Sequence, residues 1–126
     1  MEQSERLSVL VADDHEKMRD CLVRVLQTEF DVIGAVGDGD ELVNAAIELE
    51  PDVIVSDIHM PGLSGIEANK RLREQGVDVP FVFVSTDPSP MHRLAGALGA
   101  YVGKADLISH LNAKVQCVAS ERCNSI

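Results

Sequence analysis

The chain has very few aromatic residues, which together make up 3% of its 126 residues, and it has no tryptophan. Hydrophobic residues still make up 45%, which is enough for a sizeable core and argues against a disordered chain. The core must therefore be mainly aliphatic. A chain of this length is sufficient for one domain and too short for two of ordinary size.

Positive charge is also scarce, because 11 lysines and arginines face 21 acidic residues, for a formal net charge of −10. This balance disfavours direct binding to nucleic acid or to an anionic membrane, both of which need a basic surface. No apolar stretch is long enough to span a bilayer. The first six residues are polar and lack the pattern of a secretory signal.

Cysteine is the third scarcity, with Cys21, Cys117 and Cys123 and no C-x-x-C spacing among them. An odd number without a metal-binding or redox spacing is typical of a reducing compartment. The sequence therefore predicts a cytoplasmic protein without a disulfide framework.

Strand and helix patterns alternate along the chain, which is typical of βαβ units and a parallel sheet. The predicted strands are 7–12, 30–36, 53–57, 81–84 and 101–103. The predicted long helices are 16–28, 41–49, 65–75 and 106–122. A further helix at about 90–98 should be short or irregular, because prolines lie at its start and glycines near its end.

Polar residues follow the last apolar residue of four predicted strands. These residues are Asp13, Asp14, Asp57, Ser85 and Lys104. In a doubly wound sheet such strand ends converge on one crevice, where ligands bind. Each residue taken alone has an ordinary explanation, such as a helix cap, a turn or a solvated lysine. Their shared placement favours a functional site.

Three carboxylates in one place favour a hard, oxygen-ligated cation such as Mg²⁺. A lysine and a hydroxyl at the same point would bind the remaining oxygens of a phosphoryl group. The set therefore indicates phosphoryl transfer, in which a carboxylate is itself able to accept the phosphoryl group. Asp57 is the best candidate acceptor, because Asp13 and Asp14 are more natural metal ligands.

These motifs closely resemble the receiver domains of response regulators in two-component systems. The matching segments are 11–15 (VADDH), 51–62 (PDVIVSDIHMPG) and 65–67 (GIE), with Ser85, Tyr101 and Lys104. The nearest resemblance is to receivers of the LuxR/NarL type. It implies a flavodoxin-like α/β fold with helices on both faces of a five-stranded parallel sheet. The strands, numbered along the chain, would have the order 2-1-3-4-5.

The resemblance implies a role for each acidic residue. Asp57 would accept the phosphoryl group from a sensor histidine kinase or a phosphotransfer protein. Asp14 and Asp57 would ligate Mg²⁺ together with the backbone carbonyl of His59, and Asp13 would act through water. The domain would serve as a phosphorylation-activated switch rather than an enzyme.

The resemblance also implies how the switch is transmitted. Lys104 would pair with the phosphoryl group, Ser85 would move toward it, and Tyr101 would change rotamer. The output surface would be the face formed by 90–98, 101–103 and 106–122, which would bind an effector or a second copy of the chain. The whole of 1–126 would be one receiver domain, ordered from about 6 to 120, without an effector domain.

The sequence departs from the family pattern at several positions. Ala105 stands where a proline usually follows the lysine, so a trans peptide or a rearranged loop is expected. The stretch from Ser85 to Tyr101 is about one helical turn shorter than usual. This difference leaves undecided which partner the output surface would bind. Thr86, His59 and Asp87 stand where they would tune dephosphorylation, or they are ordinary loop residues.

Three other interpretations compete with this one. A haloacid-dehalogenase-like phosphatase also uses an aspartyl phosphate, but it needs a second carboxylate where His59 stands. A flavodoxin-like FMN module would have a first loop rich in Ser, Thr and Gly, whereas Asp13 and Asp14 would repel the phosphate. A degenerate receiver that only binds proteins, without phosphorylation, is the remaining alternative.

Overall fold

The computed structural model describes residues 6–85, 100–103 and 107–124, which form a five-stranded parallel sheet of order β2-β1-β3-β4-β5. The strands are β1 (Ser8–Ala12), β2 (Asp31–Val36), β3 (Val53–Asp57), β4 (Phe81–Ser85) and β5 (Ala100–Gly103). The helices are α1 (Glu16–Gln27), α2 (Gly39–Leu49), α3 (Gly65–Glu74) and α5 (Leu107–Asn124). The fold class and the strand order are therefore confirmed.

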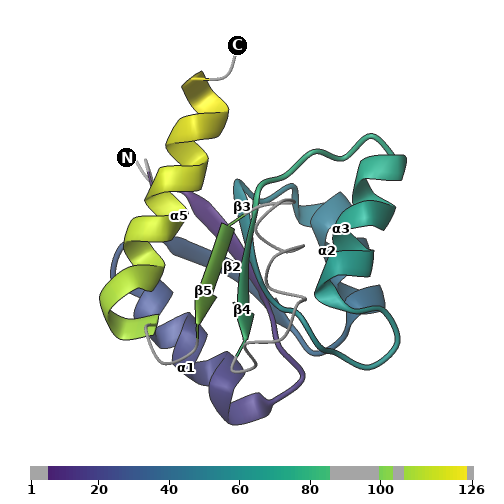
Figure 1. The fold of residues 1–126 in the computed structure, drawn as a ribbon, viewed down its shortest axis with the longest axis horizontal. Helices are drawn as coiled ribbons and strands as arrows, with labels where there is room; N and C mark the ends of the chain where they lie inside the picture. Colours follow the sequence, from purple (N-terminus) through teal and green to yellow (C-terminus); the bar gives the residue numbers. More distant parts are fainter. Residues whose placement is uncertain (1–5, 86–99, 104–106, 125–126) are drawn as a thin grey trace.

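Helices cover both faces of the sheet, with α1 and α5 on one face and α2 and α3 on the other (Figure 1). Alternate strand residues point to opposite faces, so the sheet contributes to two separate aliphatic layers. One layer joins Val9, Val11, Val55, Val82 and Val84 to leucines and valines of α1 and α5. The other joins Leu10, Ile54, Phe81 and Phe83 to α2 and α3.

The expectation of a mainly aliphatic core is correct, and the few phenylalanines are all inside it. Phe30, Phe81 and Phe83 are each at most 2% exposed. The rings of Phe81 and Phe83 are stacked with their centroids 5.2 Å apart, an arrangement that adds to the energy of burial. The three phenylalanines of the chain thus all contribute to the interior.

The edge strand β2 pairs irregularly with β1. Val9 pairs with Val32 and the next residue, Leu10, pairs with Gly34, so Ile33 is an extra residue in the ladder. This is a β-bulge, which bends a strand and interrupts its regular hydrogen bonding. The side chain of Ile33 is 37% exposed at this edge of the sheet.

A capping side chain and a proline determine where α2 begins and ends. Asp38 caps α2, because its side chain accepts from the N–H of Glu41 at 2.8 Å. Glu50 follows α2 in the left-handed region with φ of 50°, and Pro51 then prevents any continuation. The helix begins two residues earlier than the predicted 41–49, because Gly39 and Asp40 belong to its first turn.

Ser64 and Glu67 form a reciprocal capping box at the start of α3. The Ser64 hydroxyl accepts from the Glu67 N–H at 3.1 Å, and the Glu67 carboxylate accepts from the Ser64 N–H at 2.9 Å. Two otherwise unpaired backbone donors are satisfied in this way.

None of the described helices combines the length and the apolarity that crossing a membrane would require. The predicted helix at 90–98 and the Lys104–Ala105 bond lie outside the described residues.

Replacing Ser64 by alanine should lower the free energy of unfolding by about 1 kcal/mol, because the N–H of Glu67 loses its acceptor. Urea denaturation should show a lower midpoint with an unchanged slope. Ser64→Thr keeps the hydroxyl and should lose much less stability. Equal losses in both variants would contradict the capping role.

Candidate functional site

The three acidic residues predicted from strand ends lie together at the carboxyl edge of the sheet. One carboxylate oxygen from each of Asp13, Asp14 and Asp57 lies within 4.8 Å of the other two. Asp13 is fully buried, Asp57 is 7% exposed, and Asp14 is exposed to solvent. The cluster is therefore buried at Asp13 and Asp57 and open to solvent at Asp14.

Asp13 is fixed through its backbone and its side chain. Its N–H donates to the carbonyl of Val36 at 3.0 Å, and its carbonyl accepts from the Nη1 of Arg19 at 3.0 Å. Its Oδ1 accepts from the N–H of His15 at 2.8 Å. Neither Asp13 nor Asp14 caps α1, because the N-cap position is His15 and its side chain makes no capping hydrogen bond. The suggestion that an aspartate caps this helix is therefore wrong.

Asp57 is the last residue of β3 and lies beside Val84 of β4 in the register of the sheet. Its Oδ1 accepts from the N–H of His59 at 3.4 Å. Its carbonyl accepts from the hydroxyl of Ser56 at 2.8 Å, inside the protein. The backbone on both sides of Asp57 therefore restrains where its carboxylate lies.

Two glycines allow helix ends to approach the loop that follows Asp57. A Cβ at Gly65 would overlap the Asp57 carbonyl oxygen and would lie 2.7 Å from the Ser56 hydroxyl. A Cβ at Gly39 would overlap the carbonyl of Leu63. The loop 58–64 is thus held between the first turns of α2 and α3. This role was not predicted from the sequence, in which its only signal is a glycine at the start of each helix.

Ser85 also lies at this edge of the sheet. It is the last residue of β4, it is 3% exposed, and it follows Val84, the register partner of Asp57. It pairs with Gly103 of β5, and Tyr101 pairs with Phe83. The backbone of Tyr101 therefore lies in β5, directly beside β4.

The other predicted site residues either lie beside the cluster or fall outside the described part of the chain. His59 is exposed beside Asp57, and its N–H contacts the Asp57 carboxylate. Lys104, Thr86 and Asp87 lie outside the described residues. The roles predicted for those three residues stay predictions.

The donor set fits Mg²⁺. Three carboxylates crowded at one point repel one another, and a cation is the usual means of neutralising such a cluster. Magnesium prefers oxygen ligands, takes one or two carboxylates, and keeps water or phosphate oxygens at its other positions. Here two carboxylates are buried and one faces solvent, so the cluster offers both firm ligands and an open side.

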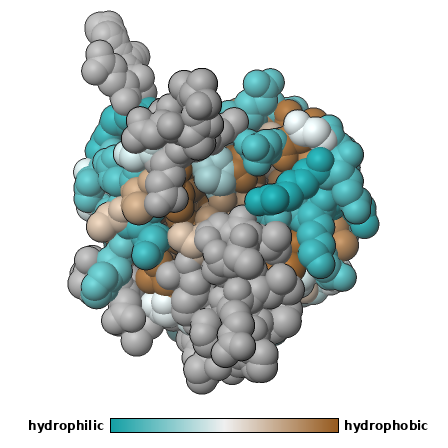
Figure 2. Space-filling model, turned by 45° about the horizontal axis from the view of Figure 1, so that its top comes forward, coloured by the Kyte–Doolittle hydropathy of each residue, from teal (hydrophilic) through white to brown (hydrophobic). Residues whose placement is uncertain are grey.

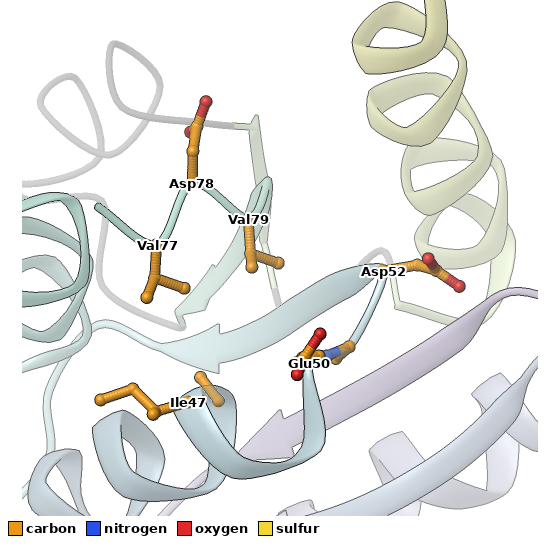
Figure 3. Close-up of a pocket in the computed structure, with 8 residues that line it drawn as sticks. Ile47, Glu50, Asp52, Val77, Asp78 and Val79 are labelled. Atoms are coloured by element: carbon orange, nitrogen blue, oxygen red, sulfur yellow. The ribbon is translucent and has the colours of Figure 1, made fainter. Parts of the chain in front are cut away.

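A separate groove of about 480 Å³ lies at the opposite end of the strands. Ile47 borders it from α2, and Val77 and Val79 border it from the stretch before β4 (Figure 3). Asp52, which precedes β3, also lines it, whereas Asp57 ends that strand. On the face drawn in Figure 2, apolar residues show near the middle and hydrophilic residues lie on either side of them. This groove is not part of the acidic site.

Residues 9–108 match the family model described as the response regulator receiver domain. The chain belongs to this family. The match includes the acidic cluster, Ser85 and all of the described sheet except Ser8 at the start of β1.

One similar curated protein is the response regulator GacA of Pseudomonas aeruginosa, which is 34% identical over 122 residues. That match covers 92% of this chain and 57% of GacA, and this chain spans about half the length of the curated relatives it matches first. The family assignment thus concerns the receiver region of those longer proteins.

Two solved receiver structures resemble the fold closely. The signal receiver domain of the putative response regulator NarL from Mycobacterium tuberculosis has a TM-score of 0.85 and 25% identity, covering 93% of this chain and 98% of that one. The response regulator domain of Thermotoga maritima CheB has a TM-score of 0.83 and 30% identity, covering 92% and 98%. The receiver resemblance stated from the sequence is confirmed.

Replacing Gly65 by alanine should disturb the acidic site more than its effect on helix stability would suggest. The added methyl group would collide with the Asp57 carbonyl and shift either the end of β3 or the start of α3. We expect a lower unfolding midpoint and weaker Mg²⁺ binding, measured by NMR titration. Ser64→Ala is the matched control, because it weakens the same helix end without crowding Asp57. Equal Mg²⁺ affinities in the two variants would contradict the packing role.

Proposed function

We propose that this receiver domain accepts a phosphoryl group on the Asp57 carboxylate in a Mg²⁺-dependent reaction and acts as a signalling switch. The observation that carries the proposal is the placement of the Asp57 carboxylate within 4.8 Å of those of Asp13 and Asp14. In the reaction, a carboxylate oxygen of Asp57 attacks phosphorus, and the bond from phosphorus to the donor breaks. The donor keeps the electron pair of that bond.

Differences in exposure and contacts among the three carboxylates support Asp57 as the acceptor. Asp13 is fully buried, and its Oδ1 already accepts from the N–H of His15. Asp14 is exposed, so it is not held firmly for attack on a bound phosphoryl group. Asp57 combines a restrained position at the end of β3 with slight exposure, so a phosphoryl donor is able to reach it.

Asp14 and Asp57 would hold Mg²⁺ directly, with the backbone carbonyl of His59, while Asp13 would act through water. When bound, Mg²⁺ would neutralise charge on the oxygens of the transferring phosphoryl group. Asp13 would then serve mainly to set the negative electrostatic potential in the buried part of the site, because its side chain is buried and fixed. Asp14 would receive the ion from solvent on the open side.

Phosphorylation would be sensed at the neighbouring strands. The modification adds about −1.5 to −2 of charge and three acceptor oxygens at Asp57. Ser85 ends the adjacent strand and is nearly buried, so its hydroxyl is well placed to move toward these oxygens. Lys104 would pair with the phosphoryl group, and Tyr101 on β5 would change rotamer. Thr86, His59 and Asp87 would tune the rate of dephosphorylation.

The family assignment supports a sensor histidine kinase or a phosphotransfer protein as the phosphoryl donor. The face that includes β5 and α5 would bind an effector or a second copy of the chain. We place the domain in the cytoplasm, where its donors act. The receiver unit would occupy 1–126, ordered from about 6 to 120.

Wild-type protein incubated with Mg²⁺ and acetyl phosphate should gain the mass of one phosphoryl group, measured by intact mass spectrometry. Asp57→Asn should abolish the adduct, because an amide oxygen is a far weaker nucleophile than a carboxylate. Asp78→Asn removes an exposed carboxylate at the opposite end of the strands and should leave the adduct intact. Removing Mg²⁺ with EDTA should prevent its formation.

Two outcomes would count against the proposal. If no adduct forms on the wild type with acetyl phosphate or with a phosphorylated histidine kinase, the domain does not work by phosphorylation. An adduct that persists in Asp57→Asn would place the acceptor elsewhere.

A further inference from the structure

Arg19 is a half-buried residue of α1 that reaches back to the acidic loop. Its Nη1 donates to the carbonyl of Asp13 at 3.0 Å, across six positions of the chain. The N–H of Asp13 donates to Val36 at the end of β2. Both backbone polar groups of Asp13 are therefore held, one by the neighbouring strand and the other by a charged side chain.

The same guanidinium also lies against the loop between β2 and α2. A Cβ at Gly37 would be 3.2 Å from the Nη1 of Arg19, so the absence of a side chain there gives the guanidinium its space. The N–H of Gly37 in turn donates to the Oε1 of Glu41 at 3.0 Å. Arg19 therefore joins the loop that carries Asp13 and Asp14 to the loop that begins α2.

We propose that Arg19 is a positioning residue of the metal site, an inference that rests on the proposed Mg²⁺-dependent function. Its bond to the Asp13 carbonyl fixes the peptide between Asp13 and Asp14, because that carbonyl is part of the peptide. The directions of both side chains depend on this peptide. Arg19 thereby holds the carboxylates of Asp13 and Asp14 where they face Asp57.

The charge of Arg19 and its positioning contact predict opposite effects on Mg²⁺ binding. A positive charge near a cation site repels the cation, so removing the charge alone would strengthen binding. Loss of a contact that orients metal ligands weakens binding, by 10–100-fold for supporting residues of metal sites in general. The direction of the change in affinity therefore separates the two effects.

The experiment compares Arg19→Gln with Arg24→Gln, which removes the same charge from an exposed position on the same helix. Mg²⁺ dissociation constants are measured by NMR titration, at low and at high salt, and unfolding midpoints are measured alongside. We expect Arg19→Gln to weaken Mg²⁺ binding by about tenfold at both salt concentrations. Arg24→Gln should leave the affinity unchanged or slightly raised. Arg19→Lys keeps the charge and one donor and should recover part of the loss.

Gly37→Ala is the second variant, used in case Arg19→Gln does not fold. It keeps the charge and moves the guanidinium by a few tenths of an ångström, so it should also weaken Mg²⁺ binding. An affinity at or above that of the wild type in the folded Arg19 and Gly37 variants would overturn the inference. A lowered unfolding midpoint with unchanged affinity would also overturn it, because Arg19 would then have only a structural role.

Failure of the proposed function would look different. The wild type itself would then show no Mg²⁺ binding and no phosphoryl adduct, and the inference would fall with it. If the wild type binds Mg²⁺ and the Arg19 variants bind it equally well, the inference about Arg19 is overturned and the proposed function stands.

Discussion

Mutual repulsion among the carboxylates of Asp13, Asp14 and Asp57 is the constraint on which the rest of the site depends. The parallel pairing of β1 with β3 forces these residues to the same edge of the sheet. Burial of Asp13 and Asp57 raises the cost of bringing their charges together, since little water screens them. The cluster therefore suits a cation, whose positive charge would offset the repulsion among the three carboxylates.

The surrounding loops keep this unfavourable arrangement in place. Gly39 and Gly65 bring the first turns of α2 and α3 against the loop after Asp57, and Arg19 ties the loop after β1 to the one after β2. The large aliphatic layers on both faces of the sheet supply the stability that allows such a site. The positions of the acidic residues thus depend on contacts among three loops as well as on the strands that carry them.

The sequence predicted the parts of this structure that follow from local pattern and from general rules of parallel sheets. Apolar runs ending in Asp13 and Asp57 were enough to place both carboxylates at one edge, and the predicted helix 41–49 differs from α2 by two residues at its start. The roles of Gly39, Gly65 and Arg19 could not be predicted, because they arise from contacts between loops whose paths depend on the completed fold. The same limit applied to His15, where the rule for helix caps pointed to the neighbouring aspartates.

The bulge in β2 has a consequence for the behaviour of the domain at high concentration. An exposed edge strand with apolar side chains is a template on which another chain is able to extend the sheet. The extra residue at Ile33 breaks the even spacing of donors and acceptors that an incoming strand would need. The bulge thereby makes the β2 edge of the sheet a poorer template for the addition of a strand from another molecule.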